Sequence, residues 1–112
     1  MKIINKTKNY IISDNCIKYN SILLKAIGLM FSKKKDLLFF FKKEQIIPLH
    51  MFFVFFTIDV LFVDKNYKIV EIKKNFKPFS YYKPKNPAKY IIEISKKKLK
   101  NTKINDLLEF KK

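Results

Sequence analysis

Ile-Pro-Leu-His-Met-Phe-Phe-Val-Phe-Phe-Thr-Ile-Asp-Val-Leu-Phe-Val-Asp, residues 47–64, is the most apolar run in a chain that is otherwise rich in lysine. Only His50, Thr57 and Asp59 interrupt its apolar interior. An unpartnered buried polar group costs about 1–3 kcal/mol, and a buried charge costs more. We therefore expect this run to form the core, and its three polar side chains are candidates for a ligand site or a polar core.

The rest of the chain repeats this pattern of short apolar runs separated by turns of Asn, Asp, Ser and Lys, which is typical of a mainly β domain. The run itself divides near Thr57 into two expected strands, 47–53 and 58–63, on which His50 and Asp59 would be neighbours. Further strands are expected at 1–6, 9–13, 37–41, 67–73, 88–94 and 104–110. Residues 42–45 are expected to be a polar link, and residues 75–87, with three of the four prolines, an irregular segment.

One short helix is expected over about residues 20–30, because Ile22, Leu23, Ala26, Ile27 and Met30 share one helical face behind a possible N-cap at Asn20 or Ser21. Without repeats or linkers, residues 1–112 should form a single small domain, a β-sandwich or a partly closed barrel. The residues expected to be buried are Leu23, Phe52, Phe53, Val60, Phe62 and Ile91.

The net charge of +16 permits two interpretations. All 25 basic residues are lysine, and the joint richness in Lys, Ile, Asn, Phe and Tyr is what A/T-rich coding produces, so the lysine surface can exist without an anionic partner. Arginine, which binds phosphate through two parallel hydrogen bonds, is absent from the sequence. Lysine still holds phosphate as a point charge, so binding of anions or of nucleic acid stays open.

Other features of the sequence limit the class of protein to which the chain can belong. The single Cys16 cannot form an intramolecular disulfide and fits a reducing compartment. The start of the chain has no signal-peptide pattern, and the longest uncharged stretch, 45–58, is too short to span a bilayer as a helix. We expect a cytoplasmic protein with no membrane contact. Paired metal-ligand spacings and a glycine-rich phosphate loop are absent, so neither a metal nor a cofactor is expected.

Several blocks of the chain resemble one family. Gly-Leu-Met-Phe at 28–31, His-Met-Phe-Phe-Val-Phe-Phe at 50–56, Ile-Asp-Val-Leu-Phe-Val-Asp at 58–64 and Asn-Pro-Ala-Lys-Tyr-Ile-Ile-Glu-Ile at 86–94 are similar, in this order, to the domain of unknown function 192. This is uncharacterised protein family 0127, in the form common among archaea. The resemblance implies a compact β-rich fold and no established reaction. The chain departs from the family where Thr57 replaces a usual Pro and Asn105 a usual Gly, although Asn tolerates left-handed backbone well.

His50 and Asp59 allow two interpretations. On paired strands, a hydrogen bond between the carboxylate and the imidazole would raise the basicity of the ring and allow a hydrolase-like activity. No Ser or Cys stands in a nucleophile motif, however, which a catalytic triad requires. In the structural interpretation, which we favour, Asp59 caps a turn or accepts backbone N–H groups where a strand bends, and His50 hydrogen-bonds to a neighbouring carbonyl. Enzyme activity is therefore not expected.

The aromatic and basic segment 75–90 is the best candidate for a binding surface, through Phe76, Phe79, Tyr81, Tyr82, Lys83, Lys85 and Tyr90. Exposed rings beside cations suit single-stranded nucleic acid or an anionic sugar. Alternatively, the prolines fold these rings back as a lid over the core. The leading hypothesis is a non-enzymatic domain that binds a small ligand or a protein partner in a groove near residues 47–59 and 75–90. The alternative is an anion or nucleic-acid binding module, and the hydrolase-like activity is the weakest hypothesis. The ligand and the oligomeric state are not encoded in any pattern of the sequence.

Overall fold

A computed structural model describes residues 1–20, 36–50, 57–95 and 98–112 of the chain. They form ten strands and no helix. The strands are β1 Lys2–Asn5, β2 Tyr10–Ser13, β3 Ile17–Asn20, β4 Leu37–Gln45, β5 Leu49–His50, β6 Ile58–Val63, β7 Ile69–Phe76, β8 Tyr81–Tyr82, β9 Ala88–Ser95 and β10 Leu108–Lys111. The predicted helix lies outside the described residues, apart from Asn20, which ends β3. The predicted core positions Leu23, Phe52 and Phe53 lie outside them as well.

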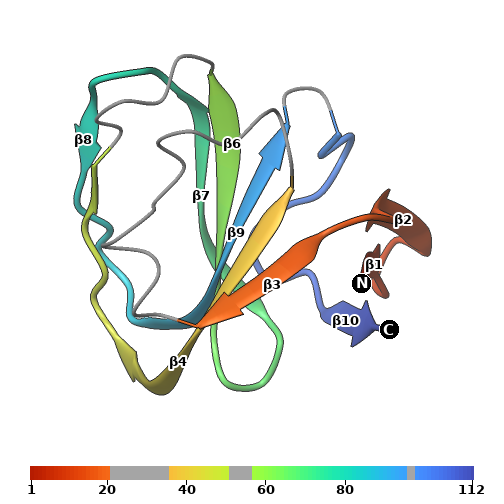
Figure 1. Cartoon of the computed structure of the whole chain (residues 1–112). Helices are drawn as coiled ribbons and strands as arrows, with labels where there is room; N and C mark the ends of the chain where they lie inside the picture. The colour runs from red at the N-terminus through yellow and green to blue at the C-terminus, as the bar shows by residue number, and fades with distance from the viewer. Residues whose placement is uncertain (21–35, 51–56, 96–97) are drawn as a thin grey trace.

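The described strands form three sheets (Figure 1). A five-stranded sheet has the order β3-β4-β9-β6-β7, in which β3 and β4 are parallel and the other pairs are antiparallel. A small sheet of β10, β1 and β2 lies on one side and carries both termini, while β8, which pairs with β5, lies on the opposite side. None of these sheets, as far as they are described, closes on itself. The domain is therefore mainly β, as predicted, but its sheets do not make a barrel.

The five-stranded sheet is covered on both faces, which explains why its interior strand β6 is buried at all six positions. We call one side the ribbon face: here Val60, Phe62 and Ile91 pack with Leu49 of β5 and Tyr82 of β8. On the other side Leu61, Val63 and Ile92 are among the residues that pack with Ile3, Ile12 and Leu108 of the small sheet. The predicted burial of Val60, Phe62 and Ile91 is confirmed, since each is 0% exposed.

The prediction of a polar link at residues 42–45 is wrong, because these residues continue strand β4. The strands around His50 and Asp59 are not neighbours. Because β7 and β9 occupy both edges of β6, β5 has no edge of β6 to join, and it pairs with β8. The turn at Asn105 has the expected left-handed backbone, with φ of 78°.

Candidate functional site

The pairing of β5 with β8 brings together two segments that are 31 residues apart in sequence. In this β5–β8 ribbon Leu49 is opposite Tyr82 and His50 is opposite Tyr81. The side chain of His50 lies outside the described part of the structure. The ribbon therefore brings the backbone of one polar candidate, His50, beside the aromatic segment.

Asp59 has a partner other than His50. The register of β6 and β7 shifts between Ile58 and Val60, and opposite this bulge Asn75 takes a left-handed conformation with φ of 54°. The backbone N–H of Asn75 donates a hydrogen bond of 2.9 Å to Oδ1 of Asp59. This contact is of the kind that the structural interpretation of Asp59 describes. Thr57, directly before β6, is half-buried.

The aromatic segment divides between the core and the surface. Phe76 is buried, and the half-buried Tyr82 packs with the same hydrophobic cluster on the ribbon face. The side chains of Phe79 and Tyr81 remain 61% and 56% exposed, beside the exposed Lys83 and Lys85.

Tyr90 does not belong to this surface, because its ring packs with the opposite cluster and lies against Tyr67 and Phe110. Tyr90 is therefore separated from the other predicted surface residues of the segment. Each interpretation describes part of the segment, because the rings of Phe76 and Tyr82 pack on the core while those of Phe79 and Tyr81 stay exposed.

Glu71, which the sequence analysis did not single out, holds this segment in place. Its carboxylate accepts hydrogen bonds from the hydroxyl of Tyr82, from the backbone N–H groups of Lys85 and Asn86 at 2.9 and 3.1 Å, and from Nδ2 of Asn86 at 3.0 Å. Burial raises the pKa of Glu71, but these hydrogen bonds outweigh burial and bring it below the ordinary value of 4.5. The ammonium of Lys73 lies 5.4 Å from the centre of the Tyr82 ring.

Glu93 is the anomalous side chain of the ribbon face. It lies on β9, in register with Leu37 of β4 and Val60 of β6, and it is 4% exposed. Its Oε1 is the one buried side-chain oxygen without a hydrogen-bond partner in the described part of the chain. Burial raises the pKa of Glu93 to about 8, so it is mostly a neutral carboxylic acid at pH 7.

A sequence signal for Glu93 existed, because a carboxylate between Ile92 and Ile94 in a predicted strand is unusual for an interior position. The described residues contain no group of three or more His, Cys, Asp and Glu side chains able to hold a metal ion. The buried Cys16 is a poor nucleophile, since burial, and next the nearby Asp36, raise the pKa of its thiol to about 12. No described helix is long and apolar enough to span a membrane.

Comparison with known proteins identifies the family of this chain. The family model DUF192, described as Uncharacterized ACR, matches residues 18–109. The chain belongs to this family. This DUF192 protein is 37% identical over 94 residues to the UPF0127 protein PH1112 of Pyrococcus horikoshii, a match that covers 81% of each chain.

Solved structures share the fold. A crystal structure of a Sinorhizobium meliloti protein superposes with a TM-score of 0.81 at 20% identity and covers 96% of this chain and 89% of the other. A protein of unknown function from Novosphingobium aromaticivorans gives the same TM-score at 16% identity, with 97% and 82% covered. These likenesses concern the fold alone.

Proposed function

We propose that this DUF192 protein is a non-enzymatic binding domain whose small ligand contacts the ribbon face near residues 47–59 and 75–90. The observation that carries this proposal is the unpartnered carboxyl oxygen of Glu93 in an otherwise apolar surrounding. A buried polar atom left unpaired costs about 1–3 kcal/mol, and natural proteins rarely retain such a cost without a use for the group. A ligand that hydrogen-bonds to Glu93 offsets this cost on binding.

The protonation state of Glu93 indicates the class of ligand. A neutral carboxylic acid offers one O–H donor and one carbonyl acceptor in the same plane. An amide, a carboxylic acid or a nucleobase edge presents the matching acceptor and donor. We therefore expect a small, largely apolar molecule with one such polar edge, since Glu93 lies between Leu37 and Val60.

A catalytic role receives less support. His50 and Asp59 stand on strands of different sheets, and the described contact of Asp59 is with the backbone of Asn75. Glu93 has no described neighbour that would hold or relay its proton. Binding without reaction is the function that these contacts favour.

Native mass spectrometry of the purified protein tests the proposal. We expect a constant extra mass on the wild-type protein, which is lost in Glu93→Leu, because the leucine side chain offers the ligand neither a donor nor an acceptor. Glu109→Leu, which removes an exposed carboxylate of the same type, is the matched control and should retain the extra mass. Retention by Glu93→Leu contradicts the assignment. The proposal also fails if the wild-type protein carries no extra mass and no compound of a small-molecule library raises its melting temperature.

The alternative function, an anion or nucleic-acid binding module, is supported on the segment 75–90 by the exposed Phe79 and Tyr81 beside Lys83 and Lys85. Anisotropy of a labelled single-stranded RNA compares Tyr81→Leu with Tyr67→Leu, since Tyr67 is another exposed ring. Selective loss in Tyr81→Leu favours stacking on this segment, whereas equal binding by both variants contradicts it.

A further inference from the structure

A basic hollow lies away from the β5–β8 ribbon, between β7 and the turn that precedes β10. It has a volume of about 880 Å³. Three lysines, Lys74, Lys100 and Lys103, line it together with Ile72 and Ile104. Because β7 is the edge strand of the five-stranded sheet, one wall is a sheet edge and the other is the turn at residues 100–104.

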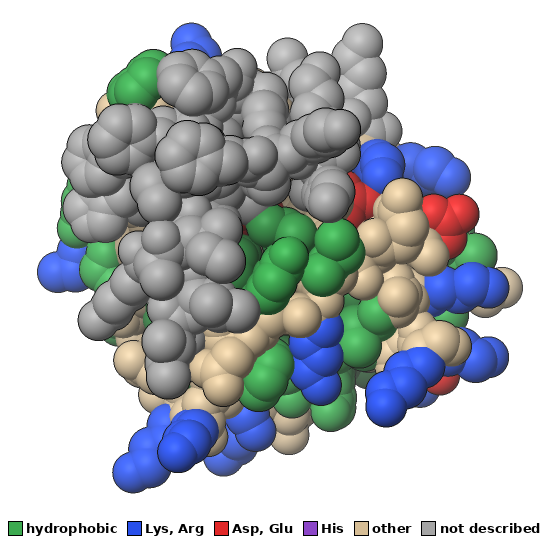
Figure 2. Space-filling model, viewed as in Figure 1, with side chains coloured by type: hydrophobic (Ala, Val, Ile, Leu, Met, Phe, Trp, Pro, Cys, Tyr) green, Lys and Arg blue, Asp and Glu red, His purple; other side chains and the backbone are tan. Residues whose placement is uncertain are grey.

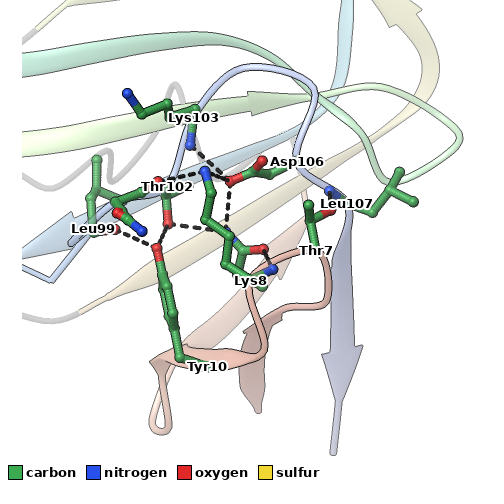
Figure 3. A network of polar contacts seen from close by, with 10 residues as sticks. Thr7, Lys8, Tyr10, Leu99, Thr102, Lys103, Asp106 and Leu107 are labelled. Carbon is green, nitrogen blue, oxygen red and sulfur yellow. Dashed lines mark hydrogen bonds and ion pairs between the residues drawn. The ribbon is translucent and has the colours of Figure 1, made fainter.

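A polar network fixes the turn that carries two of these lysines (Figure 3). Oδ2 of Asp106 accepts hydrogen bonds of 2.9 Å from Nδ2 of Asn5, from Nζ of Lys8 and from the backbone N–H of Lys103. The Thr102 hydroxyl in turn accepts a hydrogen bond from Asn5 at 3.2 Å. The ammonium of Lys103 points away from this network. The lysine is therefore anchored through its backbone and presents its charge outward.

The charges of the hollow are unbalanced. No carboxylate is among its lining residues, and none of its three lysines forms an ion pair with the described acidic residues. The charge of the nearby Asp106 is already paired with Lys8. Lys100 lies over the ring of Tyr10, with its ammonium 5.2 Å from the ring centre.

The distribution of acidic residues increases this imbalance. Five of the nine acidic side chains of the protein are buried: Asp36, Asp59, Glu71, Glu93 and Asp106. The surface is therefore more basic than the net charge alone indicates. Figure 2 shows this for one face of the molecule, where lysine side chains are numerous and acidic ones are few.

We propose that this hollow binds the phosphodiester backbone of a nucleic acid without reading its sequence. Three ammonium groups around one depression supply positive charge for phosphates, which lysine contacts as point charges. No aromatic ring lines the hollow, so bases have nothing to stack on there. A concave site between a sheet edge and a turn receives a protruding chain, whereas a bilayer surface would need a flat or convex patch.

Fluorescence anisotropy of a labelled 20-nucleotide oligothymidine tests the proposal, with titrations at about 50, 100 and 200 mM NaCl. The test variant is the triple substitution Lys74→Gln, Lys100→Gln and Lys103→Gln. The control is Lys42→Gln, Lys43→Gln and Lys65→Gln, which removes the same charge from exposed positions outside the hollow. Thermal melts of both variants verify that they fold, and the single variant Lys74→Gln replaces the triple variant if the latter does not.

The test variant should weaken binding at least about tenfold at 100 mM salt and reduce the slope of log K against log salt by about 2, since each lost contact to single-stranded DNA removes about 0.7. The control should change the affinity by less than about threefold. Equal losses in both variants would mean that net charge alone attracts the oligonucleotide, which overturns the proposal. Binding to vesicles of anionic phospholipid that is lost in the test variant, without binding to DNA, would also overturn it. Glu93→Gln should leave DNA binding unchanged, so the two sites are tested separately.

Discussion

Glu71 and Glu93 lie on the same face of the five-stranded sheet and are buried to nearly the same extent, 7% and 4% exposed. The carboxylate of Glu71 accepts four hydrogen bonds from the segment that it anchors. Oε1 of Glu93 has none in the described part of the chain. Burial alone therefore does not determine the role of a carboxyl group. Its hydrogen-bond partners decide whether it serves as an ionised anchor or remains a neutral group available to a ligand.

The two glutamates have opposite effects on stability as the pH changes. The pKa of Glu71 is lowered on folding, so its contribution to the free energy of unfolding is present above pH 4.5 and is lost as the pH falls through the folded pKa. The pKa of Glu93 is raised from 4.5 to about 8, so its contribution to the free energy of unfolding is fully present below pH 4.5 and is lost as the pH rises toward 8. Substitutions at these glutamates and at their neighbours test the two effects separately.

The largest effect is expected for Glu93→Gln at pH 8. The raised pKa corresponds to roughly 4 kcal/mol of stability lost by the wild-type protein at that pH, since each unit is worth about 1.4 kcal/mol. The variant should therefore be more stable by about 4 kcal/mol at pH 8 and by less than about 1 kcal/mol at pH 5. Urea denaturation at both values, with Glu109→Gln as the control, measures the difference. A variant no more stable than wild type at pH 8 would mean that Glu93 has a partner.

Glu71→Gln should have the next largest effect and the opposite sign. The amide keeps one acceptor oxygen but turns an NH₂ group toward the donors of Tyr82, Lys85 and Asn86. Because hydrogen bonds to a charged acceptor contribute about 1.5–3 kcal/mol each, we expect a loss of roughly 2–4 kcal/mol at pH 7. The loss should shrink below pH 4.5, as the wild-type carboxylate becomes protonated. Urea denaturation across this range gives both values, and a loss that is independent of pH would contradict the account.

Much of the scaffold behind this contrast was predictable from sequence, because β6 and β9 are dense apolar runs whose burial follows from composition. The position of β5 was not, since a two-residue strand pairs with β8 through contacts that no local pattern encodes. The role of Glu71 depends on the distant backbone of Lys85 and Asn86. For Glu93 the sequence showed a carboxylate in an apolar strand, but the absence of a partner is a property of the folded neighbourhood.

Tyr82→Phe removes one of the four donors to Glu71 and keeps the ring against Phe62 and Phe76. We expect a loss of about 1–2 kcal/mol, since one hydrogen bond to a carboxylate is removed. Tyr19→Phe is the control, because Tyr19 stacks on Phe39 and its hydroxyl makes no described hydrogen bond. A double-mutant cycle with Glu71→Gln should show coupling of more than about 0.5 kcal/mol, and strictly additive effects would exclude the contact.

The smallest effect is expected for Asp59→Asn, at a third buried carboxylate of the same sheet. Asp59 has one described hydrogen bond, from the backbone of Asn75, and the amide oxygen of Asn can still accept it. The substitution should cost about 1 kcal/mol or less by thermal denaturation. A loss as large as that of Glu71→Gln would show that the number of donors does not explain the difference between these carboxylates.

The central claim is that Glu93 is a neutral, unpartnered carboxylic acid on the ribbon face. A ¹³C NMR titration of the side-chain carboxyl carbons measures this directly, because the protein has only four glutamates and Glu93→Gln assigns the signal of interest. The account predicts that the Glu93 carbon titrates with a pKa of about 8, while that of Glu71 titrates below 4.5. A pKa of Glu93 near or below 4.5 would contradict it.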